Sequence, residues 1–136
     1  MIAESELISR LILSVVLGST VGIEREMHQS SAGMRTHALV ALGATIFTIM
    51  SLTFSGDPVR IAAGIVTGIG FLGAGAIFRY ENKITGLTTA ANLWVVAAIG
   101  LAVGLGYYYA AVAAAVIILV ILILGRFLEK KALKTY

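Results

Sequence analysis

Long stretches without a charged residue alternate with short charged segments along the chain. Three such stretches are Thr36–Gly56 with 21 residues, Ile61–Phe78 with 18 and Ile84–Gly125 with 42. One helix needs about 20 apolar residues to cross a bilayer, so the longest stretch predicts two helices. We expect the break between them at Gly104-Leu105-Gly106, because glycine weakens a helix. The tyrosines that follow this break suit a membrane interface.

The first hydrophobic segment is shorter than the others. Only 13 uncharged residues separate Arg10 from Glu24, which gives about 20 Å of helix against a hydrocarbon core of about 30 Å. We still expect it to span, with Arg10 snorkelling outward or with Glu24 and Arg25 drawn into the boundary of the bilayer. It is not typical of a signal peptide, because Glu4 and Glu6 stand where a basic region would be. The predicted spans are about 7–26, 36–55, 60–79, 85–104 and 107–126.

The composition also indicates a membrane protein. Hydrophobic residues make up 59% of the chain, charged residues 12%, and there are 15 glycines, whereas soluble domains have about 45–50% apolar and about 25% charged residues. Too few polar residues are present to cover a soluble domain. The apolar content excludes a disordered chain, and the absence of cysteine excludes disulfide frameworks and thiolate metal sites. We therefore predict an all-α integral membrane protein, a single domain of residues 1–136 with five transmembrane helices in a glycine-rich, tightly packed bundle.

Lysine and arginine predict the orientation. Five spans place the termini on opposite sides, and cytoplasmic segments carry the excess of basic residues. With the N-terminus outside, the outer segments hold only Arg10 and Arg60. The inner segments hold Arg25, Arg35, Arg79, Lys83, Arg126, Lys130, Lys131 and Lys134. We predict an N-out, C-in protein whose basic tail contacts anionic lipid headgroups and not nucleic acid.

Glycine spacing predicts close helix packing. The run Gly68-Ile-Gly-Phe-Leu-Gly73 matches the dinucleotide-binding pattern, but that motif follows a strand and opens a helix, whereas this run lies inside a predicted span. Glycines four residues apart let neighbouring helix backbones approach closely. We expect this packing to occur within the chain, and a dimer face is the alternative. The predicted packing glycines are Gly18, Gly22, Gly64, Gly68, Gly73, Gly75, Gly100 and Gly104.

The inner loop between the first two spans concentrates charge. Residues 24–37 contain Glu24, Glu26, Arg25 and Arg35, together with both histidines of the chain, one of which is His37. The simpler interpretation is a structural network in which Glu24 pairs with Arg35, or Glu26 with Arg25. A functional site is the alternative, because the short first span pushes charge toward low dielectric and a histidine can titrate near neutral pH.

A polar stripe is predicted on the fourth span. Thr85, Thr88, Thr89 and Asn92 fall at helical spacing and would share one face. Threonine can bond to its own backbone, but the Asn92 amide needs a partner from another helix. The stripe is therefore interpreted as inter-helix contact, with a polar lining of a cavity or ion path as the alternative.

The outer loop offers little chemistry. Asp57 and Pro58 stand where a helix cap and a first-turn proline are expected, just before Arg60. One carboxylate is a poor divalent-cation site, since such ions want about six or more oxygens, so metal ligands stay unassigned. No spacing assembles a nucleophile with its base and orienting acid. We predict no catalytic residues and no cofactor.

These motifs together resemble the MgtC/SapB family of bacterial inner-membrane proteins. The blocks that carry the resemblance occur in order over about residues 14–104. They are Gly22-Ile-Glu-Arg-Glu26, Ala32-Gly-Met-Arg-Thr-His-Ala-Leu-Val-Ala-Leu-Gly43, Asp57-Pro-Val-Arg-Ile61, Gly68-Ile-Gly-Phe-Leu-Gly-Ala-Gly75 and Gly86-Leu-Thr-Thr-Ala-Ala-Asn-Leu-Trp94. The residues that fall on family motif positions are Glu24, Arg25, Arg35, Thr36, His37, Asp57, Arg60, Thr88 and Thr89.

The resemblance implies a five-helix, multi-pass protein of the bacterial inner membrane that is not an enzyme. It also implies a link with growth at low magnesium, with survival of pathogens inside macrophages, and with regulation of membrane partners such as the F-type ATP synthase. The family name suggests magnesium transport. This chain departs from the family in two ways: it ends at Tyr136, so we expect a short member without the cytosolic C-terminal domain, and Asn92 stands where a smaller hydroxyl residue is expected.

We therefore predict a non-enzymatic membrane factor in magnesium and ATP homeostasis. It would act through contacts with partner membrane proteins and form a homo-oligomer such as a dimer. The alternative is a transporter or channel for a cation or small solute, which the polar stripe and the inner charged cluster favour. A purely structural subunit is a third interpretation.

Overall fold

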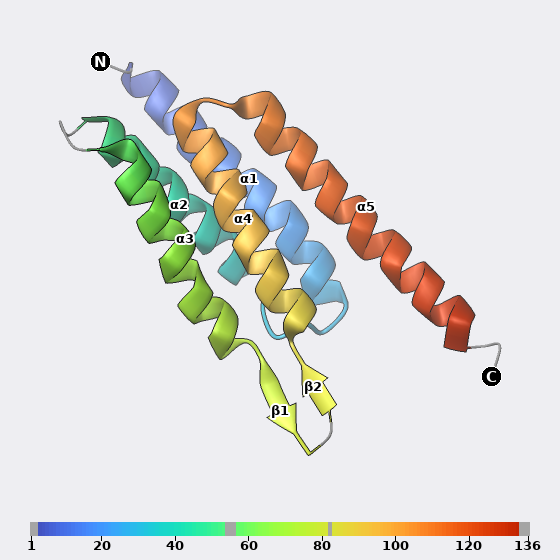
Figure 1. Cartoon of the computed structure of the whole chain (residues 1–136). Coiled ribbons are helices and arrows are strands. Elements are labelled where there is room, and N and C mark those ends of the chain that lie inside the picture. Colours follow the sequence, from blue (N-terminus) through green and yellow to red (C-terminus); the bar gives the residue numbers. More distant parts are fainter. Residues whose placement is uncertain (1–2, 54–56, 82, 134–136) are drawn as a thin grey trace.

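The computed structural model describes residues 3–53, 57–81 and 83–133, which form five helices and a β-hairpin. In order these are α1 (Glu4–Met27), α2 (Met34–Thr53), α3 (Pro58–Gly75), β1 (Phe78–Tyr80), β2 (Lys83–Thr85), α4 (Leu87–Leu105) and α5 (Tyr108–Leu133). Successive helices run in opposite directions, so the N-terminus lies at one end of the bundle and the C-terminus at the other (Figure 1). We call the end with the N-terminus and the α4–α5 turn the upper end. The lower end holds the α1–α2 loop and the hairpin (Figure 1).

Four helices in the described residues are long and apolar enough to cross a membrane, and these are α1, α2, α4 and α5. Helix α3 is apolar but shorter. Its 18 residues rise about 27 Å, a little less than a hydrocarbon core of about 30 Å. The count of five spans therefore stays a prediction. Positions 54–55 of the second predicted span, the start of the outer loop and Lys134 lie outside the described residues.

The hairpin between α3 and α4 is a short non-helical element that the sequence did not predict in an otherwise all-α chain. The third span was predicted to reach residue 79, but α3 ends at Gly75, where Ala76 N donates to Gly73 O at 3.1 Å. Strands β1 and β2 then pair antiparallel, with Arg79 opposite Ile84. Aromatic and β-branched residues favour strands, and both strands are rich in them. Two strands of three residues each are too short to give a clear alternating pattern, so the sequence did not predict them.

Helices α1, α2 and α4 form the centre of the bundle, and α3 and α5 flank it on opposite sides (Figure 1). The central cluster joins Val21 of α1, Ala41 of α2 and Val96 of α4 to Ile118 and Leu122 of α5. Side chains facing outward are mostly large and apolar, as expected for helices surrounded by lipid.

Four glycines lie where central helices approach backbone to backbone. A Cβ on Gly18 would lie 2.7 Å from His37 O, and one on Gly22 would lie 2.6 Å from Met34 Cα. A Cβ on Gly104 would lie 2.6 Å from Thr48 Cβ, and one on Gly100 would meet the Ala41 carbonyl. These contacts are too short for a side chain, so α1 and α4 can pack this closely against α2 only with glycine.

Helix α3 behaves differently. A Cβ on Gly73 would make only ordinary contact, 3.6 Å from Ala90 Cβ, while Gly64, Gly68 and Gly75 have no atom within 4 Å of that position. The expectation that these last three glycines pack within the chain is therefore wrong. Their spacing marks a small-residue face, but spacing does not say which helix covers it.

Local signals set two helix boundaries as predicted. Helix α4 ends at Leu105, and Gly106 adopts a left-handed φ of 86° while Tyr107 N bonds to Ala102 O at 2.8 Å. This is the glycine-ended arrangement that satisfies the last carbonyls of a helix, and it confirms the break at 104–106. At the start of α3, the Asp57 side chain accepts from Val59 N at 3.0 Å, which is the expected cap.

Candidate functional site

A deeply buried polar contact joins His37 of α2 to Asn92 of α4. His37 is 0% exposed and Asn92 3% exposed. His37 Nδ1 lies 2.8 Å from Gly33 O, and Asn92 Nδ2 lies 3.2 Å from His37 Nε2. A carbonyl only accepts, so Nδ1 donates to Gly33 O, and Nε2 accepts from the amide NH2 that faces it. His37 therefore supplies a partner for the Asn92 NH2 from another helix, while Asn92 Oδ1 is buried without a hydrogen-bond partner in the described residues.

Hydroxyl groups extend this polar interface toward the upper end. Thr45 Oγ1 donates to Ala41 O at 2.9 Å within its own helix and lies 2.8 Å from Gly100 O of α4. Thr48 Oγ1 donates to Ala44 O at 2.7 Å. Each hydroxyl is buried, and each is satisfied by a carbonyl, which is what low dielectric requires. No pattern in the sequence singles out these threonines.

The predicted stripe on α4 is only partly formed. Thr85 belongs to strand β2 and not to the helix, and Thr88 is exposed. Only Thr89 and Asn92 face the core. The helix begins two residues later than predicted, because Gly86 has a left-handed φ of 87° that ends the hairpin.

The lower end carries a charged cluster with an unexpected member. Glu24 Oε1 lies 2.6 Å from Arg126 Nη2 of α5, and Glu24 Oε2 lies 4.0 Å from Arg25 Nη1. Arg35 is exposed. Among the described residues Glu24 therefore pairs with Arg126 and not with Arg35. Glu26 does not pair with Arg25 either, since its Oε2 accepts from Met34 N at 2.8 Å at the start of α2.

A second charged cluster lies at the upper end, where Arg10 is only 7% exposed. Arg10 Nη2 lies 2.6 Å from Glu6 Oε1, and Arg10 Nε donates to Tyr108 OH at 3.0 Å. Arg10 Nη1 donates to the Gly104 carbonyl, so the cation sits at the C-terminal end of α4, which favours positive charge. Arg10 thus does not snorkel outward. The four-residue spacing of Glu6 and Arg10 on one helix is the sequence signal from which their ion pair could have been predicted.

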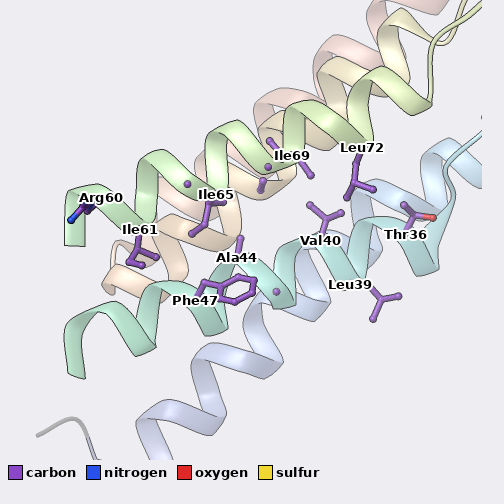
Figure 2. Close-up of a pocket in the computed structure, with 14 residues that line it drawn as sticks. Thr36, Leu39, Val40, Ala44, Phe47, Arg60, Ile61, Ile65, Ile69 and Leu72 are labelled. Carbon is purple, nitrogen blue, oxygen red and sulfur yellow. The ribbon is translucent and has the colours of Figure 1, made fainter. Parts of the chain in front are cut away.

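An apolar groove of about 650 Å³ opens between α2 and α3. Figure 2 shows Val40 and Ile65 pointing into the space between the two helices, with Thr36 and Arg60 at opposite ends. We call it the α2–α3 groove. It is lined by Thr36, Leu39, Val40, Gly43, Ala44, Phe47, Arg60, Ile61, Gly64, Ile65, Gly68, Ile69, Leu72 and Ala97.

A second pocket, of about 550 Å³, lies at the lower end and is more polar. The end of α1 and the α1–α2 loop form one side, and the hairpin and the first turn of α4 form the other. We call it the hairpin pocket. Its polar lining includes Arg25, Ser30, Ser31, Thr88 and Thr89.

The predicted site residues thus separate into distinct places. His37 and Asn92 meet in the core, and Glu24 and Arg25 form the lower cluster. Thr36 and Arg60 line the α2–α3 groove, Thr88 and Thr89 the hairpin pocket, while Asp57 caps α3. In the described ranges no three histidine, cysteine or carboxylate side chains gather as a metal site would require.

Comparison with known proteins agrees with the resemblance found in the sequence. The family model described as "MgtC family" matches residues 11–131. "Putative magnesium transporter YhiD" of Escherichia coli strain K12 is 46% identical over 76% of this chain and 53% of its own length. "Protein MgtC" of Salmonella typhimurium strain LT2 is 52% identical over 74% of this chain and 44% of its own length.

An uncharacterized protein of Synechocystis, slr0014, is 48% identical over 76% of this chain and 45% of its own length. This chain therefore spans about half the length of the curated relatives it matches. No solved structure matches the chain significantly. The family match and the apolar helices identify the chain as a multi-pass α-helical membrane protein of the MgtC family.

Proposed function

We propose that the chain is a non-enzymatic membrane factor in magnesium homeostasis that acts by binding a transmembrane helix of a partner protein. Support for the magnesium role comes from the family match and from the printed name of the Escherichia coli relative. Because the chain spans about half of that relative, the proposal concerns what the membrane helices do.

The observation that carries the proposal is the α2–α3 groove. Its walls are mostly apolar, and Gly43, Gly64 and Gly68 line it without contacts at their Cβ positions. Small residues of this kind let another helix approach closely within a membrane. A partner helix is therefore the occupant we propose, with the membrane part of the F-type ATP synthase as one example and a second copy of this chain as another.

The centre of the bundle supports contact over transport. Most of its buried polar groups bond to one another or to carbonyls, as Asn92 Nδ2 does with His37 Nε2 and Thr45 with Gly100 O, while Asn92 Oδ1 is buried without a partner in the described residues. The glycine contacts bring α1, α2 and α4 together at backbone distance. A transporter of a cation or small solute is the second candidate, and one observation favours it: the hairpin pocket reaches Thr89, one helical turn from Asn92. Arg25 also lines that pocket, and its charge opposes entry of a cation.

We propose five spans in the bacterial inner membrane, with the lower end in the cytoplasm. The positive-inside rule supports this orientation, since Arg25, Arg35, Arg79 and Lys83 belong to the lower end and Arg10 to the upper. The natural chain contains no cysteine, so single cysteines at Ser5, which is exposed and precedes the first predicted span, and at Ser31 test it directly. A membrane-impermeant maleimide added to intact spheroplasts should label Ser5→Cys and spare Ser31→Cys. The opposite pattern, or equal labelling, would contradict the orientation.

The groove is tested by filling it. Gly64→Leu and Gly68→Leu place a side chain in the groove, and Gly70→Leu is the matched control, on the same helix but outside the groove. All three positions have open space at Cβ, so all three variants should fold. In a strain without its own MgtC-family protein, the natural chain and Gly70→Leu should support growth at low magnesium. Both groove variants should fail at an unchanged amount in the membrane, and growth like that of the natural chain would refute the proposal.

A further inference from the structure

The first turn of α4 presents free backbone N–H groups to the hairpin pocket. The residue at the N-cap position of α4 is Gly86, which has no side chain that could accept a hydrogen bond from the first turn. The first backbone N–H of the helix that donates to a carbonyl is that of Ala90, which donates to Gly86 O at 2.9 Å. In the described part of the chain, no side chain caps the N–H groups of Leu87, Thr88 and Thr89. Unpaired backbone N–H groups at the N-terminus of a helix attract an anion, because these donors and the helix dipole both favour negative charge there.

A buried arginine forms the opposite wall. Arg25 lines the hairpin pocket and is only 9% exposed. Its Nε is buried and has no hydrogen-bond partner among the described residues. Within the described residues its ion-pair contact is the 4.0 Å approach of Nη1 to Glu24 Oε2. A buried guanidinium nitrogen without an acceptor is costly, so Nε favours an acceptor from outside the described residues.

Charge in the lower cluster leads to the same conclusion. Glu24 Oε1 lies 2.6 Å from Arg126 Nη2 and 3.7 Å from His28 Nδ1, so one carboxylate faces the guanidiniums of Arg25 and Arg126 as well as the His28 ring. The two guanidiniums together carry one positive charge more than this carboxylate balances. A divalent cation does not suit such a pocket, whereas an anion would balance the charge.

We propose that the hairpin pocket binds a phosphate group. Arg25 would supply the fork of donors that suits phosphate oxygens, and the first turn of α4 would supply N–H groups. The hydroxyls of Ser30, Ser31 and Thr88, which line the same pocket, would complete the donor set. The volume of about 550 Å³ lies within the range of about 300–1,000 Å³ usual for small-molecule sites.

The phosphate could come from two sources of the same chemistry. The residues that line the pocket belong to the hairpin and to neighbouring segments, which lie at the lower end of the bundle (Figure 1), where lipid headgroups meet the protein if the helices span. The pocket is also open to solution phosphate at that end. The inference does not rest on the proposed function, since it concerns a different pocket and uses different residues.

The test compares two phosphate sources in a phosphate-free detergent with an uncharged headgroup. Thermal unfolding of the 136-residue chain is followed while inorganic phosphate, or a short-chain phosphatidic acid, is added. Either source should raise the melting temperature of the natural chain in a saturable way. A rise with inorganic phosphate identifies a free anion, and a rise with the lipid alone identifies a headgroup.

Two variants and one control decide whether the effect belongs to this pocket. Thr88→Asp puts a carboxylate at an exposed position in the pocket, which repels phosphate and occupies the free N–H groups. Arg25→Gln removes the buried charge. Thr36→Asp makes the same change as Thr88→Asp in the first turn of α2, outside the pocket.

We expect Thr88→Asp and Arg25→Gln to weaken the apparent affinity about tenfold or more, and Thr36→Asp to keep it. If Arg25→Gln does not fold, Thr88→Asp still decides the matter, since its side chain is exposed. The proposal is overturned if neither source raises the melting temperature of the natural chain. It is also overturned if Thr88→Asp binds as the natural chain does.

Discussion

Replacing Gly18 by alanine tests whether the bundle is held at backbone distance. The new Cβ would lie 2.7 Å from His37 O and 2.9 Å from Ala41 Cβ. His37 O is a backbone atom, and the Ala41 Cβ cannot move by side-chain rotation. The overlap can therefore be removed only if α1 and α2 move apart. Such overpacking costs about 1–3 kcal/mol, while alanine in place of glycine gains about 1 kcal/mol of helix propensity.

Gly70→Ala is the matched control, because it makes the same change in the interior of α3 with no atom within 4 Å of the new Cβ. It gains the same helix propensity and adds no overlap. The propensity terms cancel in the comparison, so the free energy of unfolding of Gly18→Ala should fall below that of Gly70→Ala by about 1–3 kcal/mol.

Reversible unfolding in mixed micelles, followed by far-ultraviolet circular dichroism as SDS is added, measures this difference. We expect Gly70→Ala to be at least as stable as the natural chain and Gly18→Ala to be less stable than Gly70→Ala. Equal stability of the two variants would refute the close approach of α1 and α2, because the overlap at Gly18 would then not exist in the folded protein.

Three further predictions test the polar contacts by the same titration. Asn92→Ala leaves the buried Nε2 of His37 without its donor, and we expect a loss of about 1–3 kcal/mol; an unchanged midpoint would count against the contact. Arg10→Met removes the hydrogen bonds that hold the α4–α5 turn, so stability should fall by about 1.5–3 kcal/mol and amide exchange at the turn should quicken, whereas unaltered exchange would argue against it. Glu24→Gln should cost about 1–3 kcal/mol, and a double-mutant cycle with Arg126→Gln should give a clear coupling energy; a coupling near zero would mean that these two residues do not pair.

Local features of the fold could be predicted from the sequence. The break at Gly106 and the cap at Asp57 both depend on a few neighbouring residues, and the structure has them where expected. The hairpin was missed because each strand has three residues, too few for an alternating pattern, and both lie beside apolar helices.

Contacts between distant parts of the chain could not be predicted in the same way. His37 and Asn92 were singled out separately, but nothing in either neighbourhood says that they meet. Arg126 was assigned only to a basic tail, although it supplies the close partner of Glu24. The spacing of Gly64 and Gly68 correctly marks a small-residue face, yet that face lines an open groove instead of an internal contact.

The two charged clusters show how a bundle with few polar residues fixes its ends. At the upper end Arg10 joins α1 to the α4–α5 turn, and at the lower end Glu24 joins α1 to α5. Helix α3 has no comparable tie among the ion pairs of the described residues. The side of the bundle where α2 faces α3 is therefore the one most suited to accept another helix.

Magnesium flux into proteoliposomes that contain only this protein tests most directly whether the chain acts by contact or by transport. The natural chain, Asn92→Ala and Glu24→Gln are reconstituted after circular dichroism has shown each to be folded. We predict that none of them takes up magnesium faster than empty liposomes, while the natural chain still supports growth at low magnesium. Uptake by the natural chain that Asn92→Ala abolishes would contradict the contact mechanism and make the protein a transporter with its path along α4.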